Sequence, residues 1–258
     1  AGELEEQLGA QERRSEQRAA RIDEIQAALV PGAIRSVFQP IVDLETGGVV
    51  GYEALARFEL EPRQPPDAWF RAAAEVGLTE DLEFAALLPA IARFADLPRG
   101  TYLSLNISPA TALSERLAEA IVGIPPGWAV LEVTEHAPVA DYEALRAALA
   151  PIRLRGGRLA VDDAGSGFAS LRHILLLAPD IIKIDISITR DVDTDRARRA
   201  LASALVSFGK EMGISIVAEG IETAAELEAL RVLGVRYGQG YFIGRPSPDP
   251  IIPLGIRG

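Results

Sequence analysis

Short apolar segments typical of strands alternate with helix-like segments along most of the chain. The expected strands cover residues 37–44, 49–57, 102–107, 129–133, 159–161, 181–184, 215–218 and 237–242. The expected helices cover residues 66–75, 81–95, 142–153, 168–177, 195–212 and 223–233, and another follows Pro109. This alternation predicts an α/β fold, a variant (β/α)8 barrel of the TIM type. Its first strand should be irregular, because a tight turn at residues 45–48 joins it to the second strand.

An open, doubly wound sheet would fit the same alternation of strands and helices. Such sheets often bind dinucleotides through a glycine-rich fingerprint after the first strand. No such fingerprint follows the first expected strand, so the barrel is favoured.

Residues 2–29 are rich in Glu, Gln, Arg and Ala and are predicted to form one helix. Spacings of four and three residues define a heptad seam with a polar middle: Leu4, Leu8, Gln11, Ser15, Arg18, Ile22, Ile25 and Leu29. Such a helix either joins two protomers and passes a signal from an upstream sensory domain, or is a solvated linker. Pro31 and Gly32 then mark the boundary between a linker or signalling helix, residues 1–30, and a barrel domain, residues 31–258.

The composition excludes several kinds of site and partner. None of the 258 residues is a cysteine, so disulfides and thiolate metal sites are excluded, and a cytoplasmic location is expected. The formal net charge of -11 disfavours nonspecific binding to nucleic acid polymers or anionic membranes. A phosphate ligand stays compatible with this charge, because bound cations invert the local field. No apolar run is long enough for a membrane segment, and the charged N-terminus lacks a signal-peptide core.

Polar and charged residues recur at one kind of position, the C-terminal end of an apolar strand. They are Glu53, Arg57, Asn106, Glu132, Asp162, Asp163, Lys183, Asp185, Glu219 and Gln239. In a barrel these strand ends meet on one face, where the active sites of such barrels lie. Strand alternation also puts Lys183 and Asp185 on the same face of their strand.

Each of these residues has an ordinary structural alternative. The alternatives are an ion pair between Glu53 and Arg57, neutralisation of Asp162 by Lys183, helix capping by Asn106, Glu219 or the paired aspartates, and exposure of Glu132 on an edge. All of them would have to hold together on one barrel face, so a functional site is the better hypothesis.

The donor types indicate which metal such a site would hold. Carboxylates and an amide offer only oxygen ligands, which suit Mg²⁺ or Mn²⁺ better than Zn²⁺. The two histidines, His136 and His173, do not form a metal-type pair and are expected at the surface or at helix ends. No Walker-type loop, hydrolase elbow or cysteine nucleophile occurs in the sequence. Two oxygen-bound cations beside one lysine suit phosphoester hydrolysis by in-line attack of water.

The same residues belong to an ordered series of short motifs. The series is Phe38-Gln39-Pro40, Glu53-Ala54-Leu55 with Arg57, Leu105-Asn106-Ile107-Ser108, Glu132-Val133-Thr134-Glu135, Asp162-Asp163, Lys183-Ile184-Asp185, Glu219-Gly220-Ile221-Glu222 and Gln239-Gly240-Tyr241. With these motifs, residues 37–246 resemble the EAL family of cyclic di-GMP phosphodiesterases. A single Glu-Ala-Leu would carry no weight, whereas the ordered series is very specific.

The resemblance implies a variant (β/α)8 barrel that cuts one phosphodiester bond of cyclic di-GMP, a bacterial second messenger, to give linear pGpG. It implies two divalent cations, Mg²⁺ or Mn²⁺, one held by Glu53, Asn106, Glu132 and Asp162 and the other by Asp162, Asp163 and Glu219. It assigns catalytic roles to Lys183, Glu219 and Glu53, and substrate contacts to Gln39, Leu55, Arg57 and Gln239. It assigns supporting roles to Glu135 and Glu222, which would brace the loop after Asp163, and to Asp185, beside Lys183 or the metal ligands. In the family this loop also takes part in homodimer contacts.

One stretch departs from the family pattern. The family's loop commonly has Asp-Asp-Phe-Gly-Thr-Gly, whereas this chain has Ala164 and Ser166. Ser166 keeps a hydroxyl, but Ala164 lacks a large apolar anchor, which bears on loop order, catalytic rate and dimer coupling. The alternative function is a catalytically weak or silent EAL domain that acts as a cyclic di-GMP receptor or a regulated output module. Every residue of the implied ligand set is nevertheless present.

Overall fold

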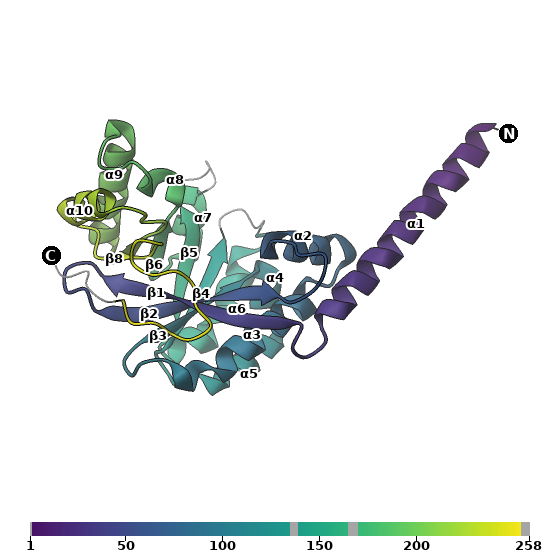
Figure 1. Cartoon of the computed structure of the whole chain (residues 1–258), viewed down its shortest axis with the longest axis horizontal. Coiled ribbons are helices and arrows are strands. Elements are labelled where there is room, and N and C mark those ends of the chain that lie inside the picture. Colours follow the sequence, from purple (N-terminus) through teal and green to yellow (C-terminus); the bar gives the residue numbers. More distant parts are fainter. Residues whose placement is uncertain (1, 135–138, 165–169, 254–258) are drawn as a thin grey trace. The chain divides into compact units, whose positions relative to one another are not determined.

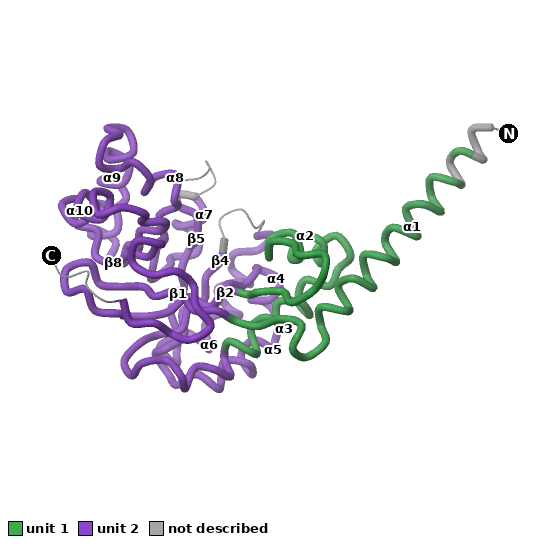
Figure 2. Tube along the Cα trace, in the orientation of Figure 1, with its two compact units in different colours: residues 1–36, 56–90 green, residues 37–55, 91–258 purple. Residues whose placement is uncertain are grey.

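The computed structural model describes residues 2–134, 139–164 and 170–253, which divide between two compact units (Figure 2). Unit 1 comprises residues 1–36 and 56–90, and unit 2 comprises residues 37–55 and 91–258. The strands are β1 (Ile34–Asp43), β2 (Val49–Phe58), β3 (Tyr102–Ile107), β4 (Ala129–Thr134), β5 (Arg158–Ala164), β6 (Ile181–Ile184), β7 (Ser215–Ala218) and β8 (Tyr237–Gly238). The helices are α1 (Gly2–Ala28), α2 (Pro66–Val76), α3 (Thr79–Ala92), α4 (Pro109–Ala112), α5 (Glu115–Ala120), α6 (Tyr142–Leu154), α7 (Ser170–Leu177), α8 (Ile186–Thr189), α9 (Arg196–Met212) and α10 (Ala224–Leu233), with 3-10 turns at Phe94–Asp96 and Ile121–Gly123.

The strands form a closed barrel in the order β1 to β8 (Figure 1). Strands β2 to β8 pair in parallel, whereas β1 runs antiparallel to β8. The turn between β1 and β2 is fixed by Asp43, whose Oδ1 accepts hydrogen bonds from the backbone N–H groups of Glu45 and Thr46 at 3.0 and 2.9 Å. The predicted variant (β/α)8 barrel with its irregular first strand is therefore confirmed.

Strand alternation fills the barrel interior with an apolar layer. Its buried members are Ile41, Tyr102, Val130, Ala160, Ile181 and Val217. Gly51 on β2 leaves room for the Tyr102 ring, because a Cβ at Gly51 would lie 2.5 Å from ring atoms of Tyr102. Side chains two residues further along a strand lie on the same face. The apolar layer therefore adjoins a polar interior layer. That layer holds Ser104, Glu132, Asp162 and Lys183.

Unit 1 has an apolar core of its own. Ile25 and Ala28 of α1 pack there with Trp69 of α2 and Leu82 of α3. Phe58 stacks on the Trp69 ring at 5.0 Å between centroids. The helix predicted over residues 2–29 is confirmed as α1, and its seam residue Ile25 is buried in this core. The division into residues 1–30 and 31–258 stays a prediction.

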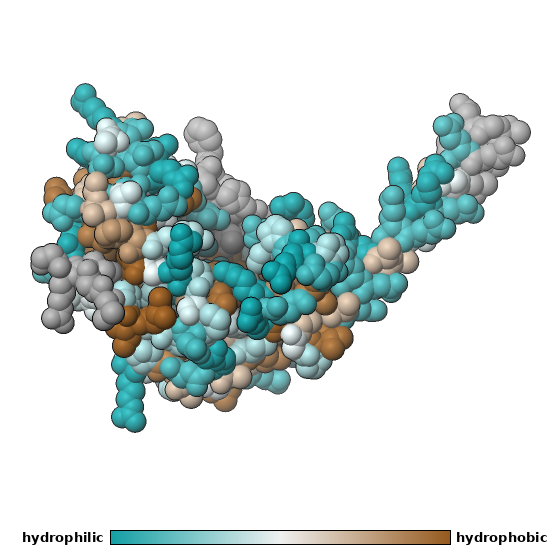
Figure 3. Space-filling view, viewed as in Figure 1, coloured by the Kyte–Doolittle hydropathy of each residue, from teal (hydrophilic) through white to brown (hydrophobic). Residues whose placement is uncertain are grey.

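The exposed part of α1 is hydrophilic (Figure 3). Residues 11–20 are all exposed and include Arg, Glu, Gln and Ser side chains. Among the residues that the structure describes, no helix has both the length and the apolarity needed to cross a lipid bilayer.

The last predicted strand, residues 237–242, is wrong over residues 239–242. β8 ends at Gly238, and the backbone N–H groups of Ile243 and Gly244 both donate to Gly240 O, at 3.1 and 2.9 Å, which closes a turn. Tyr241 is consequently 52% exposed. The apolar residues of this stretch suggested a strand, but the turn removes them from the sheet.

β5 is longer than predicted. The expected strand ended at residue 161, whereas β5 continues through Asp162 and Asp163 to Ala164. The register against β6 shifts between Val161 and Ala164. Ala164, which stands where the family commonly has phenylalanine, is fully buried.

Candidate active site

Lys183 on β6 is the centre of the polar layer. The Nζ atom lies 2.6 Å from Glu132 Oε2, 2.7 Å from Glu219 Oε1, 3.2 Å from Glu53 Oε2 and 3.4 Å from Asp162 Oδ1. The Lys183 side chain is 1% exposed. The alternative in which Lys183 simply neutralises Asp162 is incomplete, because the contact with Asp162 is the longest of the four. If all four carboxylates were ionised, they would outnumber the one ammonium, so the cluster favours either protonation or a bound cation.

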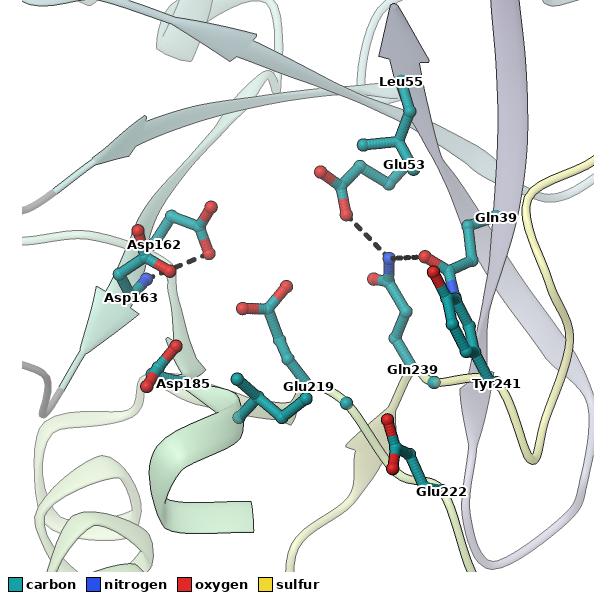
Figure 4. Close-up of a pocket in the computed structure, with 13 residues that line it drawn as sticks. Gln39, Glu53, Leu55, Asp162, Asp163, Asp185, Glu219, Glu222, Gln239 and Tyr241 are labelled. Atoms are coloured by element: carbon teal, nitrogen blue, oxygen red, sulfur yellow. Dashed lines mark hydrogen bonds between the residues drawn. The ribbon is translucent and has the colours of Figure 1, made fainter. Parts of the chain in front are cut away.

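Glu53 on β2 connects this cluster to the neighbouring amides. Asn106 Nδ2 donates to Glu53 Oε1 at 2.7 Å, and Gln239 Nε2 donates to Glu53 Oε2 at 2.7 Å. Gln239 Nε2 also donates to Gln39 Oε1 at 2.9 Å, as the dashed lines of Figure 4 trace. Gln39 in turn donates to Gly244 O at 3.0 Å. Both carboxylate oxygens of Glu53 are thus oriented by side chains from elsewhere in the barrel, Asn106 on β3 and Gln239 just after β8.

Ser104, which the motif series leaves out, belongs to the same cluster. Its hydroxyl is fully buried and donates to Glu132 Oε1, while Glu132 Oε2 accepts from Lys183. Glu132 is 1% exposed, so the alternative in which it lies exposed on an edge is wrong. The signal available in the sequence was spacing, because Ser104 precedes Asn106 by two residues on the same strand face.

The capping alternatives for Asn106 and Glu219 are also wrong. Ser108 caps α4, its Oγ accepting from the backbone N–H of Thr111 at 3.2 Å. Thr223 caps α10 in a capping box with Glu226. Asn106 and Glu219 therefore belong to the polar cluster and do not cap these helices.

Asp162, Asp163 and Glu219 form a compact group of oxygen donors. One carboxylate oxygen from each lies within 4.8 Å of those of the others. Consecutive residues of a regular strand point to opposite faces, but Asp163 has a left-handed φ of 59° at the β5 bulge. Asp162 and Asp163 consequently line the same cavity (Figure 4). Close, oxygen-only donors fit a hard divalent cation.

The electrostatics of the cluster follow from its burial and crowding. Burial raises the pKa of Glu132 to about 8, with Glu53 adding to the rise and Lys183 opposing it. Burial likewise raises the pKa of Glu219 well above its usual value, again against the effect of Lys183. Burial lowers the pKa of Lys183, but the surrounding carboxylates outweigh burial and raise it well above its usual value. Without cations, Glu132 and Glu219 retain protons at higher pH than an ordinary glutamate does.

The metal-free protein should melt at a higher temperature at about pH 5.5 than at about pH 8.5. Glu132 and Glu219 have ordinary values of 4.5, which the unfolded chain keeps, and raised values in the folded state. Above the unfolded value the folded state binds more protons, so the free energy of unfolding falls as pH rises, by on the order of 1.4 kcal/mol per pH unit for each such group. Thermal melts in a chelator measure the difference. Mn²⁺ at the higher pH should remove it, and a melting temperature that rises with pH would contradict this account.

A cavity of about 400 Å³ opens beside the oxygen donors. Its acidic lining comprises Glu53, Asp162, Asp163, Asp185, Glu219 and Glu222. The rest of its lining includes Ile186 and, as labelled in Figure 4, Gln39, Leu55, Gln239 and Tyr241. Three of the four predicted substrate contacts, Gln39, Leu55 and Gln239, thus share one cavity with the acidic group. Arg57 belongs to unit 1, and its substrate contact stays a prediction.

Two of the three predicted supporting residues, Asp185 and Glu222, lie at the cavity. Asp185 lines the cavity and also caps α8, its Oδ1 accepting from the Ser187 backbone N–H at 2.9 Å. Glu222 lines the cavity and accepts from Arg190 Nη2 at 3.1 Å. Glu135 lies outside the described residues, as does the loop at 165–169 that Glu135 and Glu222 were expected to brace. The bracing role stays a prediction.

His173 does not lie at the surface or at a helix end, so that prediction is wrong. It sits within α7 and is 2% exposed, with its Nδ1 3.0 Å from the Tyr142 hydroxyl oxygen. Its burial follows from the inward face of α7, where Ile174 and Leu177 are also buried. His136 lies outside the described residues.

Comparisons with known proteins agree with this geometry. The EAL domain family profile matches residues 22–246. The Escherichia coli K12 protein named "Probable cyclic di-GMP phosphodiesterase PdeA" is 30% identical over 237 residues, which cover 88% of this chain and 32% of that protein. The chain spans about a third of the length of the curated relatives it matches.

The chain also resembles solved structures of known proteins. Klebsiella pneumoniae BlrP1 in its calcium and cyclic di-GMP complex matches with a TM-score of 0.76 and 28% identity, covering 86% of this chain and 58% of that one. The manganese and cyclic di-GMP complex of BlrP1 at pH 6 matches with a TM-score of 0.74 and 29% identity, covering 84% of this chain and 57% of that one.

Proposed function

The chain belongs to the EAL domain family, and from this we propose that it hydrolyses one phosphodiester bond of cyclic di-GMP to linear pGpG. Two divalent cations, Mg²⁺ or Mn²⁺, are part of the proposal. The observation that carries it is the oxygen group of Asp162, Asp163 and Glu219, next to a buried Lys183. The name of PdeA supports the same substrate, and the BlrP1 structures, named as complexes of cyclic di-GMP with calcium or manganese, support a divalent cation beside it.

The cation ligands would be the carboxylates and the amide of the polar cluster. One cation would be held by Glu53, Asn106, Glu132 and Asp162, and the other by Asp162, Asp163 and Glu219. Bound cations would supply positive charge next to the phosphodiester oxygens and lower the pKa of water. This ligand set fits the four carboxylates gathered around Lys183.

Lys183 would orient the attacking water. Its ammonium is 2.7 Å from Glu219 Oε1 and 3.2 Å from Glu53 Oε2. A water held beside these three groups would have a hydrogen-bond donor and two acceptors, which fixes the direction of its lone pair toward the phosphorus. The water oxygen would bond to phosphorus while the bond from phosphorus to the ribose 3′ oxygen breaks; the water would lose a proton and the 3′ oxygen would gain one, giving linear pGpG.

The amide side of the cavity would hold the rest of the substrate. Gln39 and Gln239 are linked to each other and are 7% and 3% exposed, so their amide groups are pre-oriented. Leu55 would contact a guanine through its apolar side chain, and Arg57 would contact a phosphate or guanine.

The direct test is incubation of the protein with cyclic di-GMP and either Mg²⁺ or Mn²⁺, with chromatographic identification of the product. The expected product is pGpG, and its formation should stop in a chelator. Absence of product with both metals would refute the proposed activity. Tight binding of cyclic di-GMP that is recovered intact would instead support the receptor alternative.

The proposal includes a homodimer and an upstream sensory domain. The chain covers about a third of its curated relatives' length, which leaves room in them for further domains. The exposed residues 11–20 of α1 offer a surface for a second α1. Sedimentation velocity on the same sample tests the dimer, and a monomer at every concentration would reject it.

A further inference from the structure

Glu226, in the first turn of α10, is a buried carboxylate with three backbone donors. It is 4% exposed. Its Oε2 accepts from the backbone N–H groups of Glu222 and Thr223, at 2.8 and 3.0 Å, and its Oε1 accepts from that of Asp191 at 3.0 Å. The bond from Thr223 completes the capping box of α10. The other two bonds reach beyond the helix and are not needed for capping.

These two extra bonds join separate connections of the barrel. Glu222 lies in the connection from β7 to α10, which also carries Glu219 and Gly220. Asp191 lies between α8 and α9, 35 residues before Glu226. We call the set of three bonds to the Glu226 carboxylate the Glu226 clamp.

The conformation of Asp191 is suited to the clamp. Its φ of 57° is left-handed, a region that non-glycine residues rarely adopt. The turn is closed by bonds from the backbone N–H groups of Thr194 and Asp195 to Asp191 O, at 3.0 and 2.8 Å. With its carbonyl held in this turn, the N–H of Asp191 is free of helix pairing and donates to Glu226. A charged acceptor makes such a bond stronger than a neutral one.

The same two connections also meet at the cavity. Gly220 has a φ of 65°, and a Cβ there would lie 2.3 Å from Ile186 Cγ1. Ile186, at the start of α8, and Gly220 both line the cavity. The two connections are therefore in contact at two places. One is the packing of Gly220 against Ile186 at the cavity, and the other is the Glu226 clamp. Asp185, Glu219 and Glu222, which also line the cavity, adjoin Ile186 or belong to the β7–α10 connection in sequence.

We propose that Glu226 is a positioning residue, whose clamp holds the β7–α10 connection against the segment that follows α8 and so sets Glu219 within the oxygen group. Glu226 does not itself touch the substrate or the cations. The inference rests on the proposed function for its catalytic consequence, but the structural coupling between the two connections stands without it. Residues that orient metal ligands from behind typically contribute 10- to 100-fold to metal affinity or activity.

The experiment compares Glu226→Ala with Thr223→Ala. The Glu226 variant loses the clamp and one half of the capping box. The Thr223 variant loses the side-chain half of the same box, because Thr223 Oγ1 accepts from the Glu226 N–H at 3.2 Å, but keeps the clamp. Mn²⁺ titration by calorimetry, hydrogen exchange and turnover of cyclic di-GMP are measured on both variants well below their melting temperatures.

For Glu226→Ala, Mn²⁺ affinity and kcat should each fall about tenfold. Exchange should accelerate in residues 186–191 as well as 219–223. Thr223→Ala should exchange faster in α10 while keeping the Mn²⁺ affinity of the parent protein. Faster exchange confined to α10 in both variants, with unchanged Mn²⁺ affinity, would overturn the proposal and leave Glu226 as a helix cap.

A second variant covers the case in which Glu226→Ala does not fold. Glu226→Gln keeps the shape but has one acceptor oxygen, so it should give intermediate exchange in residues 186–191 and an intermediate Mn²⁺ affinity. Parent-like exchange and affinity in Glu226→Gln would also overturn the proposal. If the parent protein proved unable to hydrolyse cyclic di-GMP, the proposed function would fail, while Mn²⁺ affinity and exchange would still decide the role of Glu226.

Discussion

Replacing Lys183 by alanine should lower turnover of cyclic di-GMP by about a hundred- to a thousandfold. The affinity for cyclic di-GMP in the presence of Ca²⁺ should stay within about threefold of the parent value, because the substrate-side residues Gln39, Leu55 and Gln239 are untouched. The reason for the loss is that Nζ is the cationic donor at the meeting point of Glu53, Glu132, Asp162 and Glu219. Single-turnover kinetics and calorimetric binding separate the two effects.

The chain offers a matched control for this substitution. It has two lysines, Lys183 and Lys210, and Lys210 is exposed on α9. Lys210→Ala should retain both turnover and binding. A Lys183→Ala protein that kept more than about a tenth of the parent turnover would remove Lys183 from the proposed chemistry, since a water-orienting donor contributes more than that.

Asp162→Asn should weaken Mn²⁺ binding by about 10- to 100-fold and reduce turnover at least as much. Asparagine keeps the shape and one oxygen of the side chain but removes the charge from the residue proposed to serve both cations. The charge of Asp162 also helps to raise the pKa values of Glu132 and Glu219. The metal-free variant should therefore melt no lower than the metal-free parent, even though it loses an ion pair with Lys183. Calorimetry with Mn²⁺ and thermal melts in a chelator make these two measurements.

Asp249 provides the control for charge removal as such. Its side chain is 89% exposed and lies 3.3 Å from Arg93, so Asp249→Asn should change neither Mn²⁺ affinity nor turnover. Parent-like Mn²⁺ affinity in Asp162→Asn would contradict the ligand assignment. A marked drop in its metal-free melting temperature would contradict the charge-repulsion argument.

Much of the barrel was predictable because its strands are short, buried and bounded by polar residues. The predicted limits of β3, β6 and β7 coincide with those observed. β8 was not predictable in the same way, because Tyr241 and Phe242 have strand-like side chains. Their backbone is instead directed by non-local bonds, such as the one from Phe242 N–H to Ile221 O at 3.0 Å. Such contacts override local propensity.

The candidate site was likewise predictable from the sequence only in part. The ordered motifs identified the carboxylates, the lysine and the glutamines that the structure brings together. Ser104 and Glu226 were not identified, because their roles depend on partners 28 and 35 residues away in sequence. The joint use of Asp162 and Asp163 was identified from the motif. Its physical basis is the left-handed φ of Asp163, which alternation alone would not predict.

The closure of the barrel at its last strand has a mechanical consequence. β8 is held to β1 through Val42 with Gly238 and Asp43 with Tyr237, and to β7 through Val217 with Tyr237 and Ala218 with Gly238. By contrast, β4 is laddered along its length to both β3 and β5. Strand pairing is therefore distributed unevenly around the barrel wall. The strands carrying Asn106, Glu132 and Asp162 form its extensively paired arc, whereas β8, beside Gln39 and Gln239, is held by two residue pairs on each side, so we expect this seam to separate more readily than the acidic side.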